Sequence, residues 1–237
     1  MRALSFLVIQ CVGTIFGLSQ SARLYVFLPS NIRPHVMRQA LVGACPEMDI
    51  TVFSRFLEFQ ARTKEIPPDA LLSLRPVIDG KEEYDAYRPV LTGNLGGARE
   101  EAYAFLSVNR QIEPRNMDSL TIGAVDLLGR SEMNHFLGRL LGKQPKIRTV
   151  TKLEDLLTLL QFEDVTAIFV PHSKLAYYQE RSRLDLKITE LPNVVIGLPV
   201  LAVRSDKPEI QKLLRECFLS FSKDLNSNLG VDKWVQP

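Results

Sequence analysis

The sequence predicts an α/β protein of two lobes, arranged as a clamshell with a cleft between them. The stretch Asn116–Gly142 joins a buried strand, a tight polar turn and a helix with apolar residues at helical spacing. This unit then repeats, which is typical of parallel-rich sheets. The polar segment Gln111–Asp118 is a candidate crossover between lobes, and Gly197–Arg204 is a candidate return crossover. Two crossovers between two α/β lobes define a hinged molecule.

The domain boundaries follow from these crossovers. We expect a signal peptide over 1–22, a first lobe from 23–110 together with 200–237, and a second lobe over 111–199. The chain has 237 residues, of which 46% are hydrophobic, enough for one large or two small domains with a core. The net charge of +2 is too small to suggest a nucleic-acid partner.

The N-terminus differs from the rest of the chain. Arg2 supplies a positive charge, Leu4–Leu18 is apolar and uncharged, and the small residues Ser19, Ser21 and Ala22 follow. This pattern predicts a cleavable secretory signal peptide. A transmembrane anchor is the alternative, but the apolar run is short for spanning a bilayer. We therefore expect a mature protein that begins near residue 20 to 23 and is soluble outside the cytoplasm.

The first lobe is expected to alternate strands and helices. Strands are predicted over Leu24–Leu28, Asp49–Phe53, Tyr87–Leu91 and Ala102–Val108. Helices are predicted over Ile32–Ala44, over a stripe that starts at Phe53, and over the amphipathic segment Glu209–Leu225. Asp69–Leu74 is compatible with a short helix or a strand, and Thr92–Gly97 is a glycine-containing loop.

The second lobe repeats the same unit. Strands are predicted over Leu120–Val125, Ile147–Val150, Thr166–Val170, Leu186–Leu191 and Val194–Val203, and helices over residues that follow Ser131, over Leu153–Phe162 and over Ser173–Ser182. Ser131 is the expected N-cap of its helix, and Ser30 has the same position in the first lobe. A strand that leads directly into a helix N-terminus presents free N–H groups, which suit anions and carboxylates.

The sequence contains no motif for catalysis or for a cofactor. It lacks a Gly-x-Ser-x-Gly elbow, a P-loop and a complete dinucleotide fingerprint, so we expect no enzyme and no cofactor. His35, His135 and His172 are dispersed, and no Cys/His cluster has metal-ligand spacing. Cys45 and Cys217 are compatible with a disulfide or with two buried free thiols.

Four stretches carry a resemblance to a known family. They are the threonine- and glycine-containing stretch Thr92–Ser107, the entry to the second lobe at Asp118–Val125, the acidic helix and buried strand in Leu153–Val170, and the return strand Leu198–Arg204. Together they resemble the type II periplasmic solute-binding proteins of ABC transporters, including amino-acid and phosphonate receptors. The chain departs from the family where Phe105–Asn109 replaces a Phe-Ser-x-Pro-Tyr pattern.

The resemblance implies a periplasmic protein that binds a small anionic or zwitterionic solute between its lobes, with a membrane permease or sensor as possible partner. The alternative is a periplasmic sensor or accessory protein that uses the same fold without transport. Arg99 and Arg110 compete as the arginine that would hold a carboxylate. The complete set of candidate ligand-binding residues is Ser30, Asn31, Thr92, Asn94, Arg99, Arg110, Arg130, Ser131 and His172.

Overall fold

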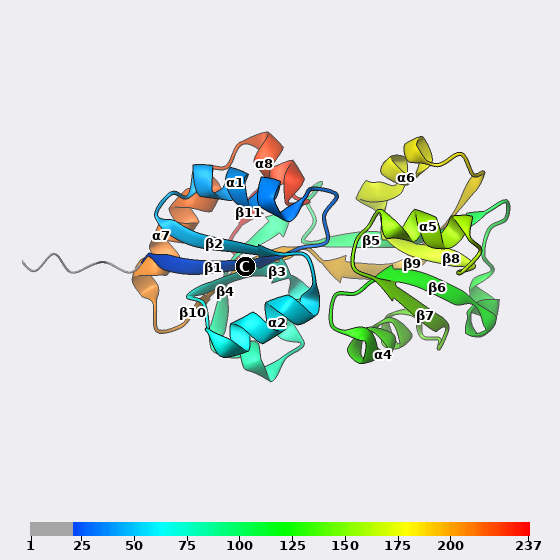
Figure 1. The fold of residues 1–237 in the computed structure, drawn as a ribbon, viewed down its shortest axis with the longest axis horizontal. Coiled ribbons are helices and arrows are strands. Elements are labelled where there is room, and N and C mark those ends of the chain that lie inside the picture. Colours follow the sequence, from blue (N-terminus) through cyan, green and yellow to red (C-terminus); the bar gives the residue numbers. More distant parts are fainter. Residues whose placement is uncertain (1–20) are drawn as a thin grey trace, which may run out of the picture.

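The computed structural model describes residues 21–237, so the predicted signal peptide lies almost wholly outside the described residues. The chain folds into two α/β lobes that are joined by extended segments (Figure 1). Within the described residues no helix is long and apolar enough to cross a membrane. The predicted two-lobe α/β class is confirmed.

The first lobe is built on a six-stranded sheet with the order β11-β4-β10-β3-β1-β2. Its strands are β1 (Ala22–Phe27), β2 (Met48–Phe53), β3 (Ala70–Leu74), β4 (Tyr87–Asn94), β10 (Pro199–Arg204) and β11 (Lys233–Val235). Its helices are α1 (Pro34–Ala44), α2 (Phe56–Glu65), α3 (Arg75–Asp79), α7 (Pro208–Leu219) and α8 (Lys223–Asn228), with a 3-10 turn η1 (Glu82–Tyr84). Helices α1 and α8 lie above the sheet and α2 lies below it (Figure 1).

The second lobe is built on a five-stranded sheet with the order β7-β6-β8-β5-β9. Its strands are β5 (Glu100–Val108), β6 (Thr121–Val125), β7 (Lys146–Val150), β8 (Ala167–Pro171) and β9 (Leu186–Gly197). Its helices are α4 (Arg130–Leu141), α5 (Asp155–Gln161) and α6 (Leu175–Arg181), with 3-10 turns η2 (Pro114–Ser119) and η3 (His172–Lys174).

Both sheets are mixed rather than parallel-rich. Strand β1 is parallel to β2 and β3, and β6 is parallel to β7 and β8. The strands that connect the lobes pair antiparallel with their neighbours, as β10 does with β3 and β5 does with β8. The βαβ units therefore supply the parallel pairs that the sequence predicted, and the connecting strands supply the antiparallel pairs.

The chain crosses between the lobes earlier than the sequence predicted. Strand β4 ends in the first lobe at Asn94 and β5 begins in the second lobe at Glu100. The segment 111–118, predicted as the crossover, instead lies within the second lobe, where the Ile112 N–H donates to Thr189 Oγ1 at 2.8 Å. The return crossover is at Leu198, whose N–H donates to the Arg99 carbonyl at 2.9 Å. The two crossovers thus lie side by side as a double hinge.

Neither predicted serine caps its helix. Helix α4 begins at Arg130 after Gly129, whose φ of 88° and N–H bond to Asp126 Oδ1 at 2.7 Å form the turn. Helix α1 begins with Pro34, which is favourable in a first helical turn, and Ser30 Oγ accepts the Ile32 N–H in the preceding loop. The helix starts are therefore set by glycine and proline geometry.

Cys45 and Cys217 form a disulfide with a Cα–Cα distance of 5.8 Å. It links the C-cap of α1 to the last turn of α7, and both helices belong to the first lobe. The sequence left open whether the two cysteines form a disulfide, and in the structure they do.

The C-terminal segment, α8 with the turn 229–232 and β11, forms a strap across the first lobe. Trp234 Nε1 donates to Asn226 Oδ1 at 3.0 Å, and Asp232 Oδ2 accepts the Gly96 N–H at 2.8 Å. Because Gly96 lies in the first crossover, the strap ties the end of the chain to the hinge.

Candidate functional site

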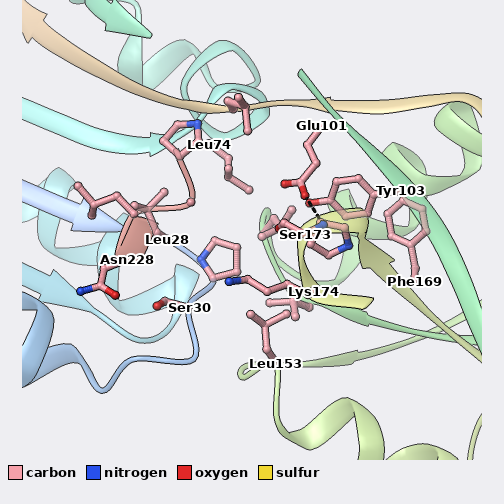
Figure 2. A pocket seen from close by; sticks show the side chains of 18 of the residues that line it. Leu28, Ser30, Leu74, Glu101, Tyr103, Leu153, Phe169, Ser173, Lys174 and Asn228 are labelled. Carbon is pink, nitrogen blue, oxygen red and sulfur yellow. Dashed lines mark hydrogen bonds between the residues drawn. The ribbon is translucent and has the colours of Figure 1, made fainter. Parts of the chain in front are cut away.

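A pocket lies between the two lobes and has a cavity volume of about 70 Å³ (Figure 2). The first lobe and the hinge contribute Leu28, Pro29, Ser30, Leu74, Leu198, Pro199 and the strap residues Asn228, Leu229 and Gly230. The second lobe contributes Glu101, Tyr103, Val125, Leu127, Met133, Leu153, Phe169, Pro171, Ser173 and Lys174. Because the walls come from both lobes, the shape of the pocket depends on how the lobes are positioned relative to each other.

Strand ends position most of the lining residues. Leu28 follows β1, Leu74 ends β3, Val125 ends β6 and Pro171 ends β8. In open α/β sheets ligands bind at the carboxyl ends of the strands. The sequence places these chain segments at one edge of each sheet, and the hinge brings the two edges together.

The polar groups of the pocket come mainly from the second lobe. Glu101 Oε1 accepts the Ser173 N–H at 2.8 Å, which fixes its carboxylate beside η3 (Figure 2). Lys174 extends from η3 across the pocket toward Ser30 (Figure 2). Burial lowers the pKa of Lys174, and the nearby charge of Glu101 partly opposes that shift. In the described part of the chain no carboxylate forms an ion pair with Lys174 within 4.0 Å.

An aromatic pair supports the floor of the pocket. Tyr103 stacks on Phe169 with ring centroids 4.6 Å apart, from the adjacent strands β5 and β8. Burial raises the pKa of Tyr103, and the neighbouring Glu101 charge adds to the rise. Tyr103 therefore stays a neutral phenol at physiological pH.

A second cavity, of about 280 Å³, adjoins the pocket and shares Leu28, Pro29, Ser30 and Val125 with it. Its remaining lining is more charged, with Arg33 on the first lobe and Lys152, Glu154 and Asp155 on the second. The inter-lobe space therefore has one part with several charged side chains and one part that is largely apolar.

Of the nine candidate residues from the sequence, only Ser30 lines the pocket. Thr92 and Asn94 are buried in β4 outside it, and Asn94 Oδ1 accepts the Gly97 N–H in the crossover. Arg99 is exposed at the hinge, and Arg110 is exposed beyond the far end of β5. Neither arginine is therefore placed to hold a solute in this pocket.

The other candidates also lie outside the pocket. Arg130 and Ser131 are exposed at the start of α4. His172 Nε2 lies 2.7 Å from Glu190 Oε2, an acidic side chain of β9. Asn31 follows Ser30 but does not line the pocket, and its Oδ1 is buried without a hydrogen-bond partner among the described residues.

Sequence reasoning missed Glu101 and Lys174, the two charged residues of the pocket. Lys174 comes shortly after the strand that the sequence predicted over Thr166–Val170, so its position near a strand end was the available signal. Glu101 is the second residue of β5, but it precedes the apolar strand that the sequence predicted over Ala102–Val108, where it was indistinguishable from a surface residue. No local signal marks Asn228–Gly230, because the strap reaches the pocket only through the tertiary fold.

Comparison with known proteins gives the fold class. No family model matches the sequence, and no curated protein matches it. Solved structures do match: the BvgS VFT2 domain of Bordetella pertussis has a TM-score of 0.58 at 14% identity, covering 88% of this chain and 91% of that one. The GluR0 ligand-binding core from Nostoc punctiforme, in complex with L-glutamate, has a TM-score of 0.56 at 12% identity, with 88% and 95% covered.

A third neighbour is the amino-acid ABC transporter substrate-binding protein AbpA from Streptococcus pneumoniae, bound to L-arginine. Its TM-score is 0.55 at 12% identity, with 88% of this chain and 93% of that one covered. The chain therefore has the type II periplasmic solute-binding-protein fold, as the resemblance predicted. Two of these three neighbours are described as a ligand-binding core and a substrate-binding protein.

Proposed function

We propose that the protein is an extracytoplasmic solute-binding protein that captures a small anionic or zwitterionic solute between its lobes. The observation that carries this proposal is the inter-lobe pocket, whose walls come from both lobes and which contains the lysine Lys174, with no carboxylate within 4.0 Å of its ammonium among residues 21–237. A solute that contacts both walls favours the closed arrangement of the lobes, because its contacts are complete only there.

The charge of the pocket supports an anionic group on the solute. Lys174 is desolvated by burial, and a carboxylate near its Nζ would replace the hydration that burial removes. Glu101 supplies the opposite charge in the same pocket, which is compatible with a zwitterion.

The proposed setting is the periplasm, with delivery of the solute to an ABC transporter. The predicted signal peptide and the likeness to a transporter binding protein support this setting. A sensory or accessory role is the second candidate, and the comparable likeness to the BvgS VFT2 domain favours it.

A thermal-shift screen of amino acids, phosphonates and organic acids tests the proposal. A solute present at 100 times its Kd stabilises by about 2.7 kcal/mol, which is about 5–11 °C in Tm for a chain of this size. The result that would overturn solute binding is a broad screen in which no compound shifts the Tm.

The location of the site has its own test. Ser30→Trp places an indole in the pocket from a loop and should abolish the shift of any hit. Ser131→Trp is the matched control, because Ser131 is exposed and outside the pocket. Equal ligand shifts in both variants would contradict the inter-lobe location.

A further inference from the structure

Away from the hinge, the two lobes touch where Gly129 of the second lobe lies against the ring of Phe56 in the first. A Cβ at Gly129 would lie 3.6 Å from Phe56 Cε1 and 3.7 Å from Phe56 Cδ1, which is van der Waals contact. Phe56 is the first residue of α2 and Gly129 is the N-cap of α4, and both helices lie toward the same edge of the molecule in Figure 1. Neither residue belongs to the crossovers at 95–99 and Leu198. The distance between them therefore depends on how far the lobes are rotated about the hinge.

The ring of Phe56 is covered from both lobes. From its own lobe, Phe27 packs on it with ring centroids 5.8 Å apart, and Lys81 Nζ lies 5.6 Å from its centroid. Gly129 covers it from the second lobe, and Phe56 is only 2% exposed. A rotation that moved the second lobe away would return part of an aromatic ring to water. Burial of apolar surface thus favours the lobe arrangement of the structure.

The backbone at Gly129 has a conformation that is suited to glycine alone. Its φ of 88° and ψ of 146° lie in a region that L side chains avoid. The start of a helix does not need these angles, because N-cap residues ordinarily have extended backbone with negative φ. The turn therefore does more than begin α4, since it lays backbone without a side chain against an aromatic ring of the other lobe.

The same turn carries residues of the inter-lobe pocket. Leu127 and Met133 line the pocket, and they flank Gly129 in the sequence. Asp126 Oδ1 accepts the Gly129 N–H at 2.7 Å, which fixes the shape of the turn. Phe56 lines neither the pocket nor the adjoining cavity. It can therefore affect a bound solute only through the position of this turn.

We infer that Phe56 is a positioning residue for the inter-lobe pocket: its ring receives Gly129 when the lobes close, which sets the second-lobe wall of the pocket against the first-lobe wall. The inference goes beyond the proposed function, because it concerns the equilibrium between lobe arrangements and not the chemistry of the solute.

Distances between spin labels on the two lobes test the inference without any solute. The labels are attached to cysteines that replace Ala61 on α2 and Arg139 on α4, both of which are exposed. Double electron–electron resonance then gives the distribution of distances in this labelled parent protein, which should include a population at the separation of the structure. Phe56→Ala should lower the ratio of this population to longer distances by about 3- to 10-fold, because Gly129 supplies part of the burial of the ring.

Phe59→Ala is the matched control for the loss of aromatic packing on the same helix. Phe59 is fully buried, and its aromatic neighbours Phe27, Phe53 and Tyr84 all belong to the first lobe. This variant should lower the Tm and leave the inter-lobe distances unchanged. Phe56→Leu keeps the position apolar and should give a smaller shift than Phe56→Ala in the same direction. The Tm of each variant establishes that it is folded.

Gly129→Ala tests the contact from the second lobe. It should also shift the distribution toward longer distances, because alanine disfavours the positive φ that lays the turn on the ring. Gly142→Ala is its control, because Gly142 has a φ of 62° at the other end of α4 and no atom lies within 4 Å of the place its Cβ would take. This control should leave the distances unchanged.

The outcomes decide the inference separately from the proposed function. The inference is wrong if folded Phe56→Ala or Phe56→Leu has the distances of the labelled parent, or if Phe59→Ala shifts them as much as Phe56→Ala does. It is also wrong if the parent has no population at the separation of the structure, because the contact would then not form without a solute. A solute screen without hits would overturn solute binding and leave the distance measurements standing.

Discussion

Loss of the Cys45–Cys217 disulfide should lower the stability of the protein by several kcal/mol. The two cysteines are 172 residues apart, so the bond closes a loop that includes the whole second lobe. The chain-entropy relation gives about 5 kcal/mol at 25 °C for a loop of this length. A chain of this size changes Tm by about 2–4 °C per kcal/mol, so a decrease of about 10–20 °C is expected.

The assay is thermal unfolding followed by circular dichroism. It compares the oxidised protein, the protein with a reductant and a Cys45→Ala/Cys217→Ala double variant. The double variant should melt near the reduced protein and should not respond to reductant. Solute affinity at 25 °C should be unchanged, because neither cysteine lines the inter-lobe pocket.

The reasoning would be refuted by a double variant whose Tm lies within about 2 °C of the oxidised protein. Such a result would mean that the unfolded chain is already restricted or that the first lobe relaxes favourably without the bond. A loss of solute affinity together with an unchanged Tm would show instead that the bond acts on the lobe arrangement.

Three further outcomes are expected. Gly93→Ala should destabilise the protein by about 1–3 kcal/mol, because its Cβ would lie 2.3 Å from Val231 Cγ1; an unchanged urea midpoint would contradict this. Phe162→Ser should change stability by less than about 0.5 kcal/mol, because Phe162 is 74% exposed, and a larger change in the same urea titration would reveal an overlooked contact. Affinity for a carboxylate solute should fall as the pH rises through the pKa of Lys174, because only the charged ammonium binds a carboxylate. Burial lowers that pKa from the 10.5 of an ordinary lysine; titration calorimetry between pH 7 and 11 measures the fall, and an affinity that stays constant through pH 10.5 would count against Lys174.

The alternation of strands and helices was predictable from the sequence because it depends on local periodicity. The strand–turn–helix unit at β6 and α4 is present as predicted. The first crossover was not predictable in the same way, since the apolar face of β5 would suit either sheet. What assigns β5 to the second lobe is its pairing with β8 and β9, which lie about 60 or more residues further along the chain.

The site was harder to predict than the fold. Arg99 and Arg110 were chosen because an arginine can hold a carboxylate. The residues that line the pocket are instead decided by which strand ends meet across the hinge. Ser30 was predicted because it lies in the turn after β1, three residues beyond the strand. Lys174 lies three residues beyond β8 and would have followed from the same rule. The strap could not have been found in this way, because its place beside the pocket depends on β11 pairing with β4.

The strap also determines the order in which the nascent protein can acquire its parts. The strands of the second lobe are complete once Gly197 has been synthesised, whereas the first lobe needs β11 at residues 233–235. The intervening residues number about 40, which take about 2–8 s at translation rates of about 5–20 residues per second. During that interval β4 lacks a neighbour on one edge and the pocket lacks one wall. The first sheet and the wall of the pocket therefore become complete only after residues 233–235 have been made.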